Sequence, residues 1–155
     1  MFNVVLVEPE IPPNTGNIGR LCMATQSTLH LIKPLGFSLD DPQLKRAGLD
    51  YWSEVNVRLW NSFDDLQSTQ SPNARYFFLT TKSGRAYYDV KFRREDFLVF
   101  GRETKGLPEN LLAANVHNCV TIPMCGTRSL NLATAVAIVL FEAVRQHGGT
   151  DTPVC

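Results

Sequence analysis

Residues 3–22 read NVVLVEPEIPPNTGNIGRLC, and this stretch shows the succession of secondary structure that decides the fold. Its first part, Val4–Val7, is apolar without alternation, which is typical of a strand buried on both faces of a sheet. A loop rich in proline and glutamate follows. Residues 14–26 then carry apolar side chains at helical spacing, with Asn14 or Thr15 as the expected N-cap. The stretch predicts a strand, a loop and a helix in succession.

The same alternation continues to the end of the chain. We expect further strands at residues 29–32, 55–59, 76–80, 97–100 and 120–122, and helices at 40–46, 63–69, 108–115 and 130–147. Strands that alternate with helices predict an α/β fold, a mostly parallel sheet with helices on both faces. No repeat or linker divides the sequence, so we expect a single domain over residues 1–155 without a separate RNA-binding domain.

Composition excludes several classes of protein. The 155 residues are 44% hydrophobic, which argues against disorder, and 15 basic residues balance 15 acidic ones, which removes the simplest argument for a nucleic-acid partner. The four cysteines form no CxxC pair and no zinc spacing, so we expect a reducing compartment and no metal. The apolar run at the start is too short for a signal peptide. We therefore expect a cytoplasmic protein without a membrane partner.

The last predicted helix carries no charge from Ser129 to Phe141. This stretch is shorter than the ~18 residues that a membrane span needs. A helix that is apolar nearly all round must be buried on most of its surface. Two interpretations stay open: a core helix enclosed within one chain, or a helix packed on the sheet and on a second copy in a two-fold dimer.

Three loop segments rich in glycine, proline and small polar residues follow predicted strands. They are residues 8–20 (EPEIPPNTGNIGR), 100–108 (FGRETKGLP) and 122–132 (IPMCGTRSLNL). In an open α/β sheet, ligands bind beyond the carboxyl ends of the strands. The segments contain neither a dinucleotide fingerprint nor a P-loop, and the three histidines form no catalytic set with a serine and an aspartate. We expect a ligand site of another kind at this edge.

In order and spacing these segments resemble the SPOUT superfamily of S-adenosylmethionine-dependent RNA methyltransferases, and most closely its ribose 2′-O branch. The resemblance extends over the whole chain, including PLGFSLDD at 34–41 and LKRAGLDY at 44–51. It implies a C-terminal deep trefoil knot, an exception to the rule that chains are unknotted, and a homodimer. Within the branch the chain is similar to the minimal bacterial members that methylate the wobble ribose, cytidine or modified uridine, in the anticodon of leucine tRNAs.

The resemblance also implies a bent S-adenosyl-L-methionine held by the knotted loops and released as S-adenosyl-L-homocysteine. The corresponding positions in this sequence are Leu79, Thr80, Phe100, Gly101, Ile122, Met124, Ser129 and Leu130. A glycine permits close backbone approach, apolar residues supply walls, and serine offers a hydroxyl. Simple core packing is the alternative for the apolar members, and we expect some of them to serve both purposes.

Arg20 is the first of the residues to which the resemblance assigns catalysis. An ordinary solvated arginine on a helix is the alternative. A guanidinium with a pKa above ~12 is a poor general base. Orienting a substrate phosphate and stabilising charge on the 2′-oxygen is therefore the role we expect.

The other residues of the implied catalytic set are Asn14, Glu103, Ser129 and Asn131. Asn14 is expected to hydrogen-bond across the pocket or to cap its helix. Glu103 is expected to anchor Arg20 or the neighbouring loop by an ion pair, or to be a solvated charge. Asn131 opens the last helix, where it could meet the cofactor carboxylate or the substrate backbone, or act as a structural cap.

RNA contact must come from local basic residues, because the net charge is zero. Residues 80–105 contain seven basic and four acidic side chains. Together with a small cluster near Tyr51 and Trp52, they suggest a phosphate-contact face near the motif loops, with the expected members Lys45, Arg46, Arg93, Arg94, Arg102 and Lys105. A solvated surface is the alternative for each of them.

Two other functions stay open. The protein could methylate a different tRNA or rRNA ribose, or it could be a non-catalytic RNA-binding protein of the same fold. The second alternative predicts that the protein does not bind S-adenosylhomocysteine.

Overall fold

The computed structural model describes residues 1–47, 51–126 and 128–148. Its centre is a six-stranded sheet in the order β3-β2-β1-β5-β4-β6. All neighbouring strands run parallel, and Val5 of the central strand lies between His30 and Val99. The strands are β1 Asn3–Val7, β2 Thr28–Ile32, β3 Val57–Trp60, β4 Tyr76–Leu79, β5 Phe97–Phe100 and β6 Cys119–Val120. The prediction of an α/β fold with a parallel sheet is confirmed.

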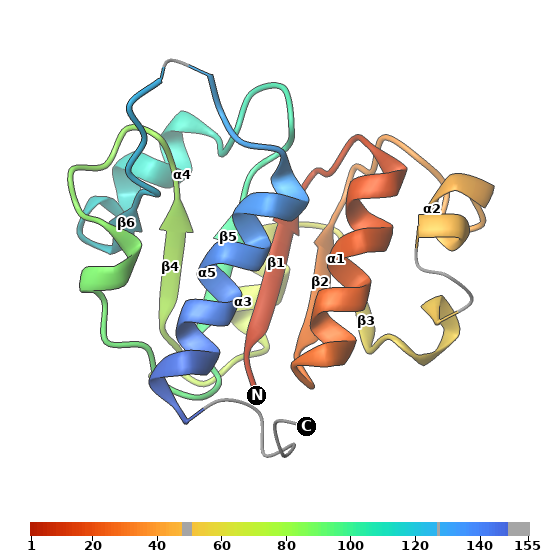
Figure 1. Ribbon diagram of the computed structural model, residues 1–155, viewed down its shortest axis with the longest axis horizontal. Coiled ribbons are helices and arrows are strands. Elements are labelled where there is room, and N and C mark those ends of the chain that lie inside the picture. The colour runs from red at the N-terminus through yellow and green to blue at the C-terminus, as the bar shows by residue number, and fades with distance from the viewer. Residues whose placement is uncertain (48–50, 127, 149–155) are drawn as a thin grey trace.

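Helices cover both faces of this sheet (Figure 1). The helices α1 Pro12–Ala24 and α5 Leu132–Gln146 pack side by side on one face, where Val4 and Leu6 of β1 meet Ile18 and Val136. On the other face, Val5 and Val7 join α3 Phe63–Ser68 and α4 Glu109–Ala114. Because both faces of β1 are covered, its residues Val4–Val7 are all apolar. The helix α2 Pro42–Ala47 packs on α1, and short 3₁₀ turns span Trp52–Glu54, Tyr87–Asp89 and Val116–Asn118.

The predicted start of α1 is wrong. The helix begins at Pro12, and Asn14 is a buried residue of its first turn; neither Asn14 nor Thr15 is the N-cap, a position held by Ile11. Prolines suit the first turn, since the amide hydrogens they lack would have no partner there. Asn14 is thereby free to bond elsewhere.

Two predicted strands also differ from the structure. The third strand begins at Val57 instead of Val55, because Val55 is the C-cap of the 3₁₀ turn Trp52–Glu54. The last strand is Cys119–Val120 instead of 120–122. The last helix begins at Leu132, and Asn131 is its N-cap: the Asn131 side-chain oxygen accepts a bond from the Thr134 amide.

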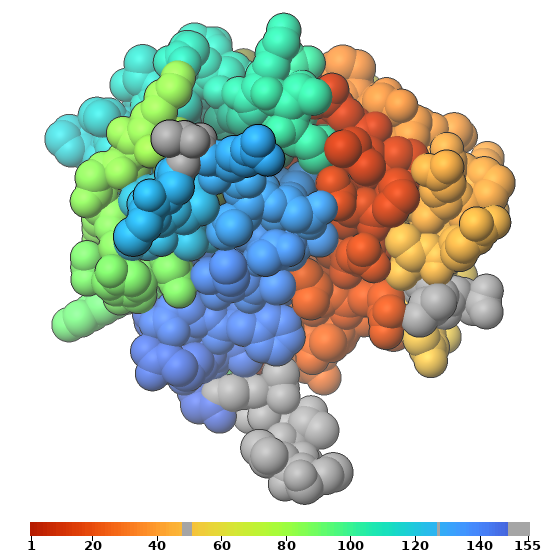
Figure 2. Space-filling view, turned by 45° about the horizontal axis from the view of Figure 1, so that its top comes forward, coloured from red at the N-terminus to blue at the C-terminus, as the bar shows by residue number. Residues whose placement is uncertain are grey.

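Among residues 1–47, 51–126 and 128–148, no element lies over the outer surface formed by α1 and α5 (Figures 1 and 2). Within α5 the inward side chains are buried, but Phe141 is 44% exposed. On α1, Asn17, Arg20 and Ala24 are exposed at helical spacing and so share the outward side. In the part of the chain that the structure describes, no helix has the length and apolar character to cross a membrane.

Candidate cofactor and active site

A cavity of about 550 Å³ opens at the carboxyl edge of the sheet. Three stretches provide most of its lining: the loop after β4, the loop after β5 and the segment that leads into α5; Ile11 and Asn14 at the start of α1 also line it. In Figure 2 the second and third of these stretches, coloured teal and blue, lie next to each other at the top of the molecule. The cavity size is within the range of small-molecule and cofactor sites, ~300–1,000 Å³.

The eight residues expected to bind a cofactor all line this cavity: Leu79, Thr80, Phe100, Gly101, Ile122, Met124, Ser129 and Leu130. Phe100 is buried in the sheet as well, whereas Met124 and Leu130 are 37% and 38% exposed. Residues separated by about 50 positions in sequence are brought together because parallel strands end at the same edge.

The loop of residues 101–107 folds back on itself at Gly101. Arg102 and Gly106 form an isolated antiparallel bridge, and the Gly106 amide donates to the Arg102 carbonyl at 2.9 Å. A Cβ atom on Gly101 would lie 2.1 Å from the Gly106 carbonyl carbon and 2.2 Å from the Leu107 nitrogen. Only glycine allows this approach of two backbone segments, so the loop is a closed unit.

Glu103 connects this loop to the start of α1. Its carboxylate accepts hydrogen bonds from the amides of Glu10 at 2.9 Å and Ile11 at 3.1 Å. The Asn14 side-chain amide also donates to it, at 3.4 Å. A negative group is favourable at a helix N-terminus. Glu103 therefore anchors a neighbouring loop, as one interpretation of the sequence expected, but it does so through backbone amides; the predicted ion pair with Arg20 is not formed.

Asn14 and Asn131 join the first and third loop segments. The Asn131 side-chain amide donates to the Asn14 carbonyl oxygen at 2.9 Å, and its own oxygen caps α5. A continuous chain of hydrogen bonds thus runs from Glu103 through Asn14 to the start of α5. Asn131 is therefore the cap of α5, and it also lines the cavity together with Ser129; its contact with the cofactor or the substrate stays a prediction.

Arg20 lies apart from the cavity of its own chain. It is exposed on the outward side of α1, and the residues lining the cavity do not include it. Among the described residues, no ion pair involves its guanidinium. The fold therefore brings together four of the five expected catalytic residues, and leaves Arg20 on the outer surface of α1.

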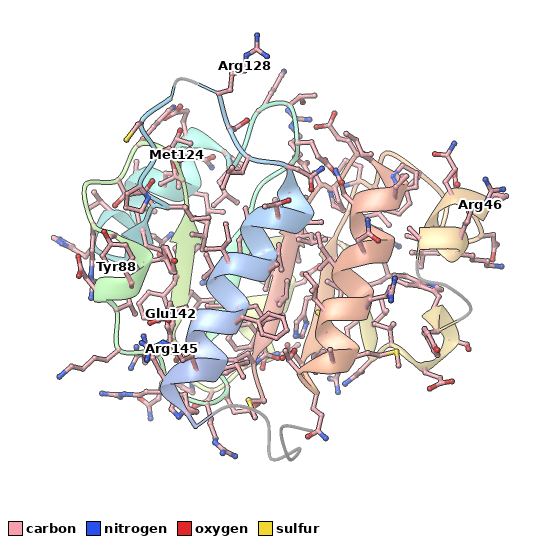
Figure 3. All side chains as sticks on the ribbon, viewed as in Figure 1. Arg46, Tyr88, Met124, Arg128, Glu142 and Arg145 are labelled. Atoms are coloured by element: carbon pink, nitrogen blue, oxygen red, sulfur yellow. The ribbon has the colours of Figure 1, made fainter. Side chains whose placement is uncertain are left out.

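The basic residues expected on the RNA face do not form one group. Arg102 and Lys105 lie at the cavity, whereas Arg93 and Arg94 precede β5 and so lie at the opposite edge of the sheet. Their predicted position near the motif loops is wrong, because the cavity lies beyond the carboxyl end of β5. Lys45 and Arg46 are on α2, beyond α1 (Figure 3).

Several residues that line the cavity or lie beside it were not identified from the sequence. Glu10 and Thr104 form a contact beside the cavity, and the wall also includes Lys82, Gly106 and Leu107. The sequence offered one signal for Glu10, which belongs to the first quoted segment and lies two residues before the start of α1. Pairing it with Thr104, 94 positions away, requires the fold.

Titratable groups in the core have shifted pKa values without forming a site. Burial raises the pKa of the Cys22 thiol to about 12 and raises that of Cys119. Cys125, in the third loop segment, is exposed. Within residues 1–47, 51–126 and 128–148, no cluster of three His, Cys, Asp or Glu side chains is arranged to hold a metal ion.

A parallel sheet with a cofactor-sized cavity at its carboxyl edge is the arrangement of an α/β protein that binds a small molecule or cofactor. The chain belongs to the SpoU rRNA Methylase family, which matches residues 1–141. Its relatives include a tRNA (cytidine(34)-2′-O)-methyltransferase of Burkholderia ambifaria, 49% identical over 151 residues, covering 96% of this chain and 97% of the relative. An enzyme of the same name from Yersinia pestis is 49% identical over 156 residues, covering 96% and 95%.

Solved structures agree in fold. One described as giving structural insights into the 2-OH methylation of C/U34 on tRNA superposes with a TM-score of 0.91 at 46% identity, covering 96% of this chain and 97% of that chain. The SpoU methyltransferase AviRb from Streptomyces viridochromogenes, in complex with the cofactor AdoMet, gives 0.82 at 25% identity and covers 96% and 58%. The resemblance to SPOUT methyltransferases inferred from the motifs is confirmed.

Proposed function

We propose that this protein transfers a methyl group from S-adenosyl-L-methionine to the ribose 2′-hydroxyl of nucleotide 34, cytidine or modified uridine, in tRNA, with leucine tRNAs as the substrates. The observation that carries the proposal is the gathering of all eight expected cofactor residues around one cavity, connected to Asn14, Glu103 and Asn131. Relatives that match nearly the whole chain bear the name of this activity.

The cavity fits the cofactor. It has apolar walls from Leu79, Ile122 and Leu130, and backbone brought close by Gly101. Such a wall suits an adenine ring, whose edge can bond to loop backbone groups. When bound, the cofactor supplies a sulfonium methyl group that is already activated for transfer. The protein must then place the ribose oxygen in line and exclude water, for which a preformed cavity is suited.

The polar residues divide the remaining tasks. The Glu103–Asn14–Asn131 chain fixes the wall next to the reacting ribose, and the Ser129 hydroxyl offers a hydrogen bond at the same wall. Arg20 orients a substrate phosphate and stabilises developing charge on the 2′-oxygen. Its guanidinium stays protonated throughout.

A homodimer is part of this proposal. The apolar α5 with exposed Phe141 and the neighbouring outward side of α1 form a continuous face. A second copy packed on that face would cover Phe141 and bring Arg20 to the interface. Since Arg20 is remote from its own cavity, a dimer explains how it could take part in catalysis.

The knot and the RNA surface are also proposed. From the edge strand β6 the chain returns past β4 and β5 to pack α5 on α1, which supports threading of the C-terminal segment as a trefoil knot (Figure 1). Arg102 and Lys105 line the cavity, which supports contacts with substrate phosphates there. Lys45, Arg46, Arg93 and Arg94 would contact more distant parts of the tRNA.

Methyl transfer in vitro tests the function. Purified protein, bulk tRNA and radiolabelled S-adenosylmethionine should give label confined to the ribose of nucleotide 34. Fractionated leucine tRNAs should accept more label than the remaining tRNAs. Label at another ribose, or in rRNA, would replace the target. Failure to bind S-adenosylhomocysteine in calorimetry would leave the non-catalytic RNA-binding function.

A further inference from the structure

Two glutamates beside the cavity each bind the loop that carries the other. The Glu10 carboxylate accepts hydrogen bonds from the Thr104 hydroxyl at 2.7 Å and the Thr104 amide at 3.2 Å. In return, Glu103 accepts from the amides of Glu10 and Ile11. Hydrogen bonds in both directions thereby join the segment before α1 to the loop after β5. We name this contact the glutamate clasp (Glu10, Ile11, Glu103 and Thr104).

The loop on one side of the clasp is part of the cavity wall. Thr104 itself lines the cavity, and so do the residues on both sides of it. Because Arg102 and Gly106 close the loop on itself and Gly101 packs against Leu107, the loop can move only as a unit. Holding Thr104 therefore sets the position of the whole loop.

The segment on the other side of the clasp is fixed independently. The Gly36 amide donates to the Pro9 carbonyl at 2.9 Å, and a Cβ atom on Gly36 would lie 2.8 Å from the Glu10 Cα atom. The backbone that carries the Glu10 side chain is thus packed between two loops. Because its backbone is held in place, the Glu10 carboxylate can fix the position of the loop of residues 101–107.

The charge of Glu10 is also maintained. The Thr104 hydrogen bonds, and to a smaller extent the nearby charges of Arg102 and Lys105, lower the pKa of this carboxyl. A carboxylate with a lowered pKa stays ionised at neutral pH, and hydrogen bonds to an ionised acceptor are stronger than neutral ones.

We propose that Glu10 is a positioning residue of the cofactor site: through Thr104 it holds the loop of residues 101–107 in its cofactor-binding position against the start of α1. The inference rests on the proposed function, since it takes the cavity to be the S-adenosylmethionine site. Glu10 does not line the cavity, and so it acts through the loop. We therefore expect substitution of Glu10 to lower mainly the affinity for the cofactor.

Calorimetric titration with S-adenosylhomocysteine tests the role in four variants. Glu10→Ala removes both hydrogen bonds to Thr104 and should weaken binding by at least about tenfold. Thr104→Val, which keeps the amide bond but loses the hydroxyl, should weaken binding less, and Thr104→Ser should restore it. Ser62→Ala is the matched control: the Ser62 hydroxyl accepts a bond from the Asp65 amide at the start of α3, so its loss should leave affinity unchanged.

Kinetics separates positioning from general destabilisation. In Glu10→Ala the KM for S-adenosylmethionine should rise while kcat at saturating cofactor changes less than about twofold. Equal affinity of wild type, Glu10→Ala and Thr104→Val would overturn the inference and leave the proposed function standing. If wild type itself fails to bind S-adenosylhomocysteine, both are overturned. Should Glu10→Ala fail to fold, the Thr104→Val and Thr104→Ser pair decides alone.

Discussion

At the scale of single residues, the cavity depends on one missing methyl group. Changing Gly101 to Ala places a Cβ atom 2.1 Å from backbone that cannot turn aside as a side chain could. The loop must shift, at a cost of about 2 kcal/mol. We expect affinity for S-adenosylhomocysteine to fall by ~30-fold in calorimetry. Gly84→Ala is the control, because its Cβ atom meets nothing within 4 Å; equal losses in both variants would contradict the packing argument.

A second residue-scale prediction concerns pH. His30 is 3% exposed, its Nδ1 atom accepts from the Trp60 indole at 3.0 Å, and its Nε2 atom lies 3.0 Å from the Asn3 side-chain oxygen. Burial, with a smaller contribution from Arg58, lowers the pKa of His30 from 6.5 to about 4. Above pH 6.5 both folded and unfolded chains keep this imidazole neutral. Between pH 6.5 and 4 only the unfolded chain takes up the proton, so stability falls as pH falls.

We expect His30 to remove about 2 kcal/mol of unfolding free energy between pH 7 and 5. Urea titrations at both values measure this loss. In His30→Gln the drop should be smaller by that amount, whereas His117→Gln, at an exposed position, should keep the wild-type drop. Parallel pH curves for wild type and His30→Gln would show that the imidazole is not the cause.

The identities of the site residues were predictable, but their bonds were not. The resemblance to the SPOUT motifs pointed to Asn14, Glu103 and Asn131, which are polar residues of the quoted loop segments. Which of them bond to each other depends on how the loops approach in space. The omission of Glu10 has the same cause: its partner Thr104 is 94 positions away.

At the scale of elements, periodicity located the helices better than their ends. Helix α1 was predicted from its apolar spacing, but its start was set two residues too late because Asn14 is a good N-cap by type. The pair Pro12–Pro13 determines the start instead, and Asn14 uses its side chain for Glu103 and Asn131. A local propensity was overridden by a tertiary hydrogen-bond network.

At the scale of elements, the prediction concerns the outer face of α5, which we propose to be the dimer interface. A glutamate in place of Phe141 would put a charge at the centre of the proposed dimer face, where it would be desolvated without a partner. We expect Phe141→Glu to sediment as a monomer where wild type sediments as a dimer. Val116→Glu, 63% exposed at a 3₁₀ turn away from that face, should stay dimeric. Dimeric Phe141→Glu would place the interface elsewhere.

At the scale of the whole molecule, strand and helix alternation predicted the fold class but not the strand order. The order β3-β2-β1-β5-β4-β6 places the first and fifth strands together at the centre. The strand order depends on which crossover connections give the best packing of helices on the sheet. This packing involves the complete layers, so it cannot be predicted from a local segment of sequence. The position of Arg93 and Arg94 was misjudged for a different reason: both precede β5, whereas the cavity lies beyond the carboxyl end of that strand.

Because the net charge of the chain is zero, we expect its electrostatic attraction for RNA to come from basic residues gathered at particular places on its surface. We expect Arg102→Glu with Lys105→Glu to weaken tRNA binding by roughly tenfold at moderate salt and to reduce its salt dependence. The pair Arg93→Glu with Arg94→Glu, at the other edge, should cause a smaller loss in the same filter-binding assay. No loss from the second pair would remove Arg93 and Arg94 from the RNA face; no loss from the first pair would remove the cavity mouth from it.

The chain contains two tryptophans, Trp52 and Trp60, and the fold gives each a different neighbour. A Cβ atom on Gly19 would lie 2.8 Å from the Trp52 ring, so this indole lies against α1 one residue before Arg20. Trp60 donates its indole hydrogen to His30. Intrinsic fluorescence therefore has two separable sources. With Trp60 replaced by Phe, emission would report the proposed approach of tRNA to Arg20 on α1. With Trp52 replaced, it would follow the protonation of His30, and neither measurement needs an attached dye.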